Sequence, residues 1–361
     1  MKTIQLKYIL SFGIIAILLA CSTEKDNYIN RKWHSTNTKY NVLYNGDLAL
    51  DKGIEDVKAT YSDNFWEVLP LERMQITEEE QKPGDTKNPN FERAETKATK
   101  AIQKHSMNIG GFEKNNQIDE SYLMLGKSRY YEHRYLPAME AFNYILYKYP
   151  NSNNVYQAQV WREKVNLKLE NEQLAIKNLN RTLKGQKKIK SQDLADIHSV
   201  LAQAYITTNV LDSAIASVKI SKKETKLKEE KARYTFILGQ LYEKLNYKDS
   251  AFVAYQEVID MKRKSPRNYT IYSHLKQSTQ FDFETGDSLV FHKNLDKLLE
   301  NIENKAFRDV IHHQRALFYD KKGNDKLAIS NYNKSLKNMS ADKYLAASNF
   351  RNISTIYYQK K

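Results

Sequence analysis

Residues 122–150 read YLMLGKSRYYEHRYLPAMEAFNYILYKYP and predict two short antiparallel helices joined by a tight turn. Gly126 in the first helix and Ala138 in the second have almost no side chain, so the two backbones can approach closely there. Phe142 follows Ala138 by one helical turn and fills the groove on the same face. Pro150 ends the second helix, because proline cannot continue a helix interior. The stretch therefore predicts a helical hairpin.

The same small residues recur along the chain at a spacing of roughly 37 to 39 residues. The second-helix alanines are Ala138, Ala175, Ala214, Ala251 and, after one skipped unit, Ala328. The residues four places after them are Phe142, Leu179, Val218, Tyr255 and Tyr332. The small residues of the first helices are Gly126, Ala202, Gly239 and Ala316. This pattern resembles the tetratricopeptide repeat, and we predict an all-α solenoid of such hairpins over residues 116–361.

Two parts of this array depart from the pattern. Residues 266–302 begin at Pro266, contain Gly286 and lack the second-helix alanine, which predicts a different local packing. Residues 344–361 predict a first helix with no second helix after it, so we expect an incomplete last repeat and a chain that is the front part of a longer protein. If so, the following apolar side chains should be poorly covered: Tyr344, Leu345, Ile353, Ile356 and Tyr357.

Residues 1–20 have the charge and apolar run of a signal peptide, too short for a confident membrane span. They end at Ala20, directly before Cys21, in the pattern of a bacterial lipobox. Cys21 is the only cysteine, so an internal disulfide is excluded and the thiol lies where lipidation needs it. We expect cleavage before Cys21, lipidation of Cys21 and a polar tether over residues 21–33, which would hold the chain on a membrane surface. The alternative is an ordinary signal peptide with an incidental cysteine.

Residues 34–115 predict an N-terminal helical segment that contains a charged, proline-bearing mobile loop over residues 77–90. Asn64–Leu71 predicts an extended piece with two adjacent aromatic residues, Phe65 and Trp66. These aromatics either pack under the first repeat or form an exposed docking patch.

The composition favours anionic partners and offers no catalytic pattern. The chain has 57 Lys and Arg residues against 43 Asp and Glu, a net charge of +14. Such a charge favours acidic proteins or peptidoglycan carboxylates as partners. The alternative is a lysine-rich surface that is simply solvated. The sequence holds no zinc-binding H-E-x-x-H, no G-x-S-x-G elbow and no phosphate-binding Walker pattern. His198 and His312 occupy the tryptophan position of the repeat and are predicted to be packing residues. We therefore expect no enzyme, no metal, no cofactor and no nucleic-acid partner.

The lipobox is followed by NTKYNVLYNGDLALDKG (residues 37–53), DNFWEVLPLERM (residues 63–74) and then the repeats. In this combination the chain resembles the PorW/SprE lipoproteins of the type IX secretion and gliding machinery. The resemblance implies a non-catalytic outer-membrane lipoprotein that faces the periplasm and links the outer-membrane translocon to other secretion components.

Two other lipoprotein classes remain open. An outer-membrane assembly lipoprotein of the BamD kind is also a lipidated repeat protein, although usually shorter. A glycan-binding lipoprotein of the SusD kind needs long inserted loops and aromatic platforms, whereas the tryptophans here number three.

Overall fold

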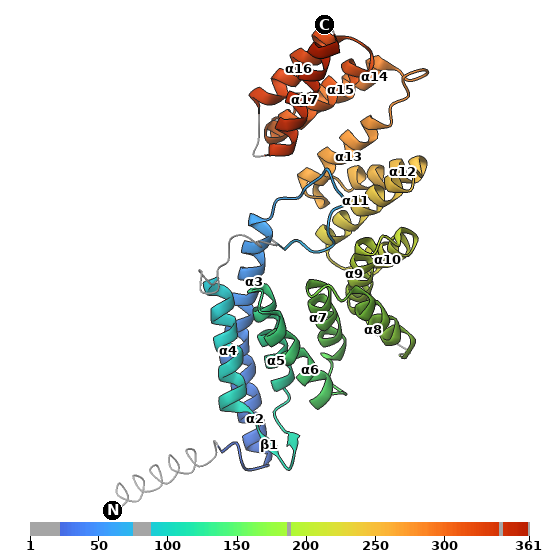
Figure 1. Cartoon of the computed structure of the whole chain (residues 1–361). Helices are drawn as coiled ribbons and strands as arrows, with labels where there is room; N and C mark the ends of the chain where they lie inside the picture. Colours follow the sequence, from blue (N-terminus) through green and yellow to red (C-terminus); the bar gives the residue numbers. More distant parts are fainter. Residues whose placement is uncertain (1–21, 75–87, 186–188, 339–341, 360–361) are drawn as a thin grey trace, which may run out of the picture. The chain divides into compact units, whose positions relative to one another are not determined.

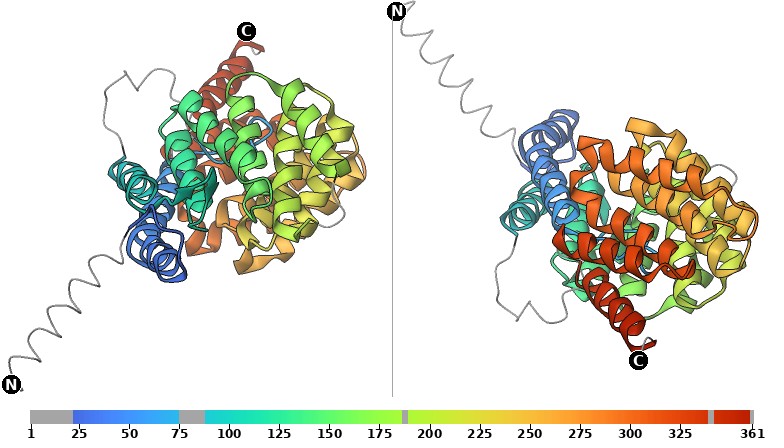
Figure 2. Two further views of the ribbon diagram at one scale, coloured as in Figure 1. Left: turned by 90° about the horizontal axis from the view of Figure 1, so that it is seen from below. Right: turned by 90° about the horizontal axis from the view of Figure 1, so that it is seen from above.

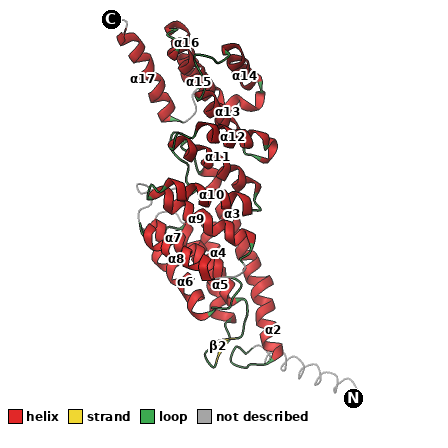
Figure 3. Ribbon diagram, turned by 90° about the vertical axis from the view of Figure 1, so that its right-hand side faces the viewer, coloured by secondary structure: helices red, strands yellow, loops and turns green. Residues whose placement is uncertain are grey.

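The computed structural model describes residues 22–74, 88–185, 189–338 and 342–359. These residues form helical hairpins and one two-stranded β-hairpin (Figure 3). The chain divides into two units: the first contains Pro70–Val210 and the described residues before 64, and the second contains Asn64–Leu69 and Leu211–Lys361. Among the described residues, no helix is both long and apolar enough to cross a bilayer.

The elements of the first unit are α2 (Tyr28–Thr36), the π-helix η1 (Asn37–Leu43), α3 (Tyr44–Thr60), α4 (Pro89–His105), β1 (Asn108–Ile109), β2 (Phe112–Glu113), α5 (Ile118–Tyr131), α6 (Tyr135–Lys148), α7 (Val155–Lys168), α8 (Glu172–Gly185) and α9 (Ser191–Thr207). Those of the second unit are α10 (Leu211–Glu224), α11 (Lys228–Lys244), α12 (Lys248–Asp260), η2 (Lys262–Lys264), α13 (Arg267–Thr279), α14 (Ser288–Glu300), η3 (Ile302–Phe307), α15 (Arg308–Lys321), α16 (Asp325–Lys337) and α17 (Lys343–Gln359).

In the first unit, α2, η1 and α3 follow one another without a break and pack with α4 and α5 (Figures 1 and 2). Close packing depends on two glycines of α3. A side chain on Gly46 would collide with Met124 of α5, and one on Gly53 would collide with the Phe91 ring of α4. Helix α2 begins at Tyr28, inside the stretch 21–33 predicted as a tether, because the Asn27 side chain caps it by accepting from the Asn30 N–H.

The repeats form the predicted hairpins, in which a second-helix ring enters the notch left by a first-helix glycine. A side chain on Gly126 would overlap the Phe142 ring, and one on Gly239 would overlap the Tyr255 ring. The α5–α6 and α11–α12 hairpins are thus built in the same way, which is the physical basis of the small-residue spacing in the sequence. The prediction of an all-α, tetratricopeptide-like helical solenoid is confirmed.

The turns between paired helices also repeat. In five of them, all except the α13–α14 connection, one residue has a left-handed backbone and the next N–H bonds to the carbonyl five residues earlier, as in Arg134 to Arg129 (2.9 Å) and Tyr247 to Tyr242 (2.9 Å). This is the Schellman arrangement that ends a helix and reverses the chain. The left-handed residues are His133, Glu170, Asn209, Asn246 and Gly323, with φ between 57° and 70°.

The unit predicted to be degenerate has a different core. Pro266 precedes α13 as predicted, and the connection between α13 and α14 contains Phe281 and Gly286. Phe281 contacts Phe291 of α14 and Phe318 of α15 edge-on, at centroid distances of 5.2 and 5.3 Å. An aromatic cluster therefore takes the place of the small-residue crossing.

Helix α17 is better covered than predicted. Leu345 and Ile356 are only 1% and 3% exposed, because they pack into the clusters formed with α15 and α16. The expectation of poor cover is wrong for these two residues and for the partly buried Ile353, and it is right for Tyr344 and Tyr357, which are 66% and 58% exposed.

Candidate functional site

In the second unit, Asn64–Leu69 lies beside α11 and α13 (Figure 1), and its Trp66 ring contacts α15; these three are the first helices of successive hairpins. The Phe65 ring stacks on Tyr272 of α13, with centroids 3.6 Å apart and an interplanar angle of 5°. It meets the rings of Phe236 and Tyr269 edge-on at 5.4 and 6.1 Å. Three aromatic side chains of the repeats thus form a seat for one ring of the segment.

Gln240 of α11 binds the main chain of the same segment. Its Nε2 donates to the Glu67 carbonyl (2.7 Å), and its Oε1 accepts from the Leu69 N–H (3.0 Å). Gln240 is 3% exposed and Leu69 is 1% exposed, so the bond between them lies away from water, whereas the bond to the Glu67 carbonyl is partly buried. A single amide therefore fixes the extended backbone at two points two residues apart.

Trp66 lies at the edge of this site. Its Nε1 donates to Asp342 (3.2 Å), and its ring meets His313 of α15 edge-on at 5.8 Å. His313 is held in turn by a 2.8 Å hydrogen bond between its Nδ1 and the Asn349 side chain. Because Trp66 is 48% exposed, its ring covers the site without being enclosed by it.

These contacts correct the expectation for the two aromatics. Phe65 does not pack under the first repeat; it packs on α11 and α13 in the second unit. The exposed-patch alternative is wrong for Phe65, whose ring is covered by Tyr272, whereas Trp66 is exposed as that alternative expected. The physical reason is that the matching rings come from repeats far along the chain.

In the first unit, the next residues contact first helices as well. The Leu71 N–H donates to Gln203 of α9 (2.8 Å). The Glu72 carboxylate accepts from Lys164 of α7 (2.9 Å) and from the Tyr130 hydroxyl of α5 (2.8 Å). Met74 is buried in the cluster formed by α5, α6 and α7. The first unit therefore holds its part of the segment with an amide, a charge pair and an apolar anchor.

Neighbouring lysine charges determine the protonation state of Glu72. Burial alone would raise the pKa of this carboxyl, but attraction to Lys164, the hydrogen bond from Lys164 and attraction to Lys168 outweigh burial and lower the pKa. Lys164 is also 4.1 Å from the centroid of the Trp161 ring, which favours a cation there. Glu72 is therefore ionised at neutral pH.

Three of the polar residues that bind the segment share one repeat position. Lys164, Gln203 and Gln240 each directly follow the first-helix position that is Gly126 in the first repeat, and Lys127 is their counterpart there. Sequence reasoning missed this polar series because it followed the small residues. In α7 the small-residue position itself is Glu163, a buried carboxylate that accepts from the Asn166 side chain (2.6 Å).

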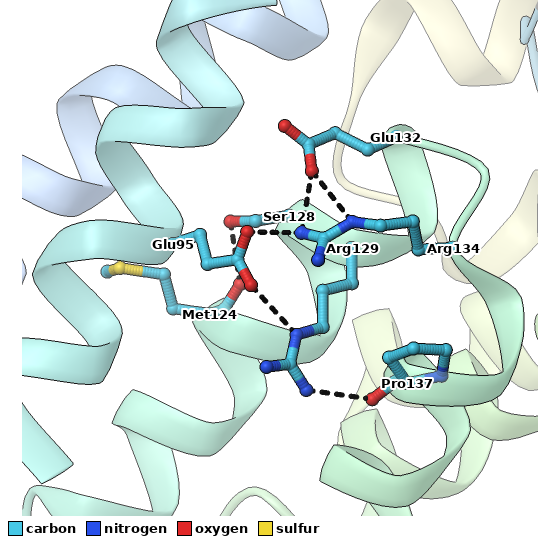
Figure 4. A network of polar contacts seen from close by, with 7 residues as sticks. All are labelled: Glu95, Met124, Ser128, Arg129, Glu132, Arg134 and Pro137. Atoms are coloured by element: carbon cyan, nitrogen blue, oxygen red, sulfur yellow. Dashed lines mark hydrogen bonds and ion pairs between the residues drawn. The ribbon is translucent and has the colours of Figure 1, made fainter. Parts of the chain in front are cut away.

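A polar network ties the N-terminal helices to the first hairpin (Figure 4). Glu95 of α4 accepts from Arg129 of α5 (2.9 Å) and from Arg134 in the α5–α6 turn. Arg134 also donates to Glu132 (3.0 Å), and Arg129 donates to the Pro137 carbonyl (3.2 Å). Burial opposes ionisation of Glu95, but the two arginines outweigh it and lower its pKa. The network fixes the turn that follows Tyr130.

The structure places the predicted repeat-packing residues as follows. The alanines and aromatics with no exposed surface are Ala138, Phe142, Ala175, Ala202, Ala214, Ala251, Tyr255, Ala316, Ala328 and Tyr332. Pro150 is exposed, two residues beyond the end of α6. Ala20 and Cys21 lie outside the described residues, as do residues 77–87 of the predicted loop 77–90; Pro89 and Asn90 belong to α4.

The described residues contain no group of three or more His, Cys, Asp or Glu side chains placed to hold a metal ion. His198 and His312 are half-buried, and burial lowers the pKa of each. His34 and His105 face each other with their Nδ1 atoms 3.0 Å apart.

Comparison with known families matches residues 232–265, which span α11 and α12, to the tetratricopeptide repeat. A comparison with curated proteins found no match. Among solved structures, the chain is similar to the apo form of RapI (12% identity, 69% of this chain and 70% of that chain, TM-score 0.43). It is also similar to MamA (15% identity, 59% and 94%, TM-score 0.34) and to a thermophilic TPR protein of Thermus thermophilus (16%, 65% and 98%, TM-score 0.33).

Proposed function

We propose that this chain is a lipid-anchored scaffold of the type IX secretion machinery, held on the outer membrane through Cys21 with its repeats in the periplasm. The main support for this proposal is that first helices of the hairpins bind an extended segment through hydrogen bonds to its main chain. Such helix faces are suited to recognising extended segments of other proteins. The repeat architecture is that of a tetratricopeptide-type protein-interaction scaffold. A scaffold of this kind acts by holding partners at fixed separations.

The finer assignment is supported by the sequence before the repeats. The lipobox at Ala20–Cys21, residues 37–53 and residues 63–74 together resemble the PorW/SprE lipoproteins. The partners would then be proteins of the secretion machinery, including the outer-membrane translocon. The net charge of +14 suits an acidic partner surface, so that the complex should weaken as salt screens exposed charges over ~8–10 Å.

The decisive experiment is deletion of the gene followed by assay of type IX cargo in the culture medium. Cargo should be lost, and the wild-type gene should restore it. A Cys21→Ser gene should restore it poorly, because the protein would leave the membrane fraction and lose labelling by a palmitate analogue. Normal export from the deletion strain would overturn the assignment.

The same strain separates the other two lipoprotein classes. Depletion of many β-barrel proteins from the outer membrane would indicate a BamD-like role, and a growth defect on one glycan alone would indicate a SusD-like role.

A further inference from the structure

The second unit has a face that requires an extended occupant. Gln240 is almost fully buried, and its amide is satisfied on both sides by main-chain groups of Glu67 and Leu69. If residues 64–69 left and nothing replaced them, this amide would lose both partners in a mostly apolar setting, which is unfavourable. The main-chain groups that it binds are common to every extended peptide. The face can therefore exchange one extended segment for another at little cost.

The side-chain contacts define which peptides fit. One ring must occupy the seat formed by Phe236, Tyr269 and Tyr272, as Phe65 does. Four residues later an apolar side chain must be buried, as Leu69 is. Between these anchors the side chains are exposed or partly exposed, so their identity matters less. The face selects an aromatic residue followed at the fourth place by a leucine-like residue.

The segment is held as a bound peptide is held. Residues 64–69 belong to no helix or strand, and Leu69 is the one fully buried side chain among them. Trp66, beside the ring seat, remains 48% exposed. By contrast, the helices that form the face pack on one another: α11 on α12 and α13, and α13 on α12 and α15. Release of the segment leaves these helix–helix contacts in place.

We propose that residues 64–69 are an intramolecular ligand of the face formed by α11, α13 and α15, and that a partner protein binds this face by replacing them with an extended segment of the same chemistry. This proposal rests on the protein-interaction role above, but not on its assignment to secretion. Because the chain's own segment is tethered, it competes at an effective concentration on the order of millimolar. The tether therefore sets how strongly a partner must bind.

The test measures binding of a fluorescent peptide with the sequence of residues 62–70, SDNFWEVLP, to the full-length chain in detergent. The variant Phe65→Ser/Leu69→Ser removes both anchors of the chain's own segment. This variant should bind the peptide at least ~10-fold more tightly than the wild type, since the internal competitor is weakened. A peptide with the same two serines should not bind, and adding Gln240→Met to the variant should weaken binding at least ~10-fold.

Three results would overturn the proposal: a folded double variant that binds no peptide, equal binding to variant and wild type, or binding insensitive to Gln240→Met. Circular dichroism and a cooperative melt establish that the variant is folded. If it is not, the wild-type chain with 5-fluorotryptophan gives a second measurement. The resonance of Trp66, assigned with Trp66→Phe, should move when millimolar peptide is added, and a fixed resonance would refute exchange.

The two proposals fail independently. Peptide binding as described, together with normal cargo export in the deletion strain, would keep the exchange site and reject the secretion role. Loss of export together with no peptide binding would keep the secretion role and reject the exchange site.

Discussion

The two units hold neighbouring parts of one segment with different chemistry on the same kind of helix. The second unit seats the Phe65 ring on aromatic side chains and fixes two main-chain groups with Gln240. The first unit pairs Glu72 with Lys164 and fixes one main-chain group with Gln203. A single repeat position thus supplies an ammonium group in one hairpin and an amide in the next. Hairpin packing stays the same while the recognised group changes.

The largest expected effect concerns the aromatic contacts of the second unit. Phe65→Ala removes the ring stacked on Tyr272 and should lower the free energy of unfolding by about 3 kcal/mol. Urea unfolding followed by circular dichroism measures the loss. Phe112→Ala is the matched control, because Phe112 is 73% exposed, and its change should stay within about 0.5 kcal/mol. Equal midpoints for the two variants would show that the seat contributes nothing.

The next effect compares the two amides. Gln240→Met removes two hydrogen bonds to the segment, one buried and one partly buried, and should cost about 2 kcal/mol, whereas Gln203→Met removes one bond to the segment and should cost about 1 kcal/mol. Methionine keeps most of the volume in both variants, so the difference reports the polar contacts. The same urea assay applies. A larger loss at Gln203 would contradict the stronger hold assigned to the second unit.

A smaller effect tests the charged side. Glu72→Gln keeps the shape of the side chain but removes its charge, and it should cost about 1 kcal/mol at low salt, since Glu72 and Lys164 are 26% and 19% exposed and solvent screens the pair in part. This cost should shrink in high salt, while the cost of Phe65→Ala should not. Salt series of urea midpoints for both variants give the comparison, and identical salt slopes would remove the distinction between the two faces.

The smallest effect is the pH dependence of the same pair. The folded pKa of Glu72 lies below its ordinary value of 4.5, so the stabilisation is fully present above that value and is lost as pH falls through the folded pKa. The difference between wild type and Glu72→Gln should therefore be constant from neutral pH down to about 5.5 and fade at lower pH. Urea midpoints at several pH values measure it, and a difference that grows on acidification would reverse the assignment.

The hairpins could be predicted from the sequence because their crossing is local. Gly126 and Phe142 meet within one hairpin, so the spacing of small and aromatic residues contains the geometry directly. The turns were harder to predict, since Asn209, His133 and Gly323 are residue types that adopt a left-handed backbone more readily, but Glu170 is not. At Glu170 the repeat context imposes a conformation that glutamate rarely adopts.

The candidate site could not be predicted in the same way. The bond from Trp66 to Asp342 joins residues 276 positions apart, and no periodic pattern links them. The residues at Lys164, Gln203 and Gln240 carry a readable signal, a polar side chain directly after the small-residue position. That signal says that the position is polar, but it does not say what the side chain binds.

The π-helical segment η1 affects how α2 is rotated relative to α3 about their common axis. The buried positions from α2 to α3 include a series at every fourth residue: Asn30, His34, Thr38, Val42, Gly46 and Leu50. In an α-helix four residues overshoot a full revolution by about 40°, so such a series would wind around the cylinder. In η1 the Tyr44 N–H bonds to the Lys39 carbonyl, five residues earlier, so each turn holds more residues. This wider turn reduces the excess rotation, and the series stays closer to one face. Loss of a single residue here would rotate α2 by about 100° relative to α3, and with it the direction in which the preceding chain departs.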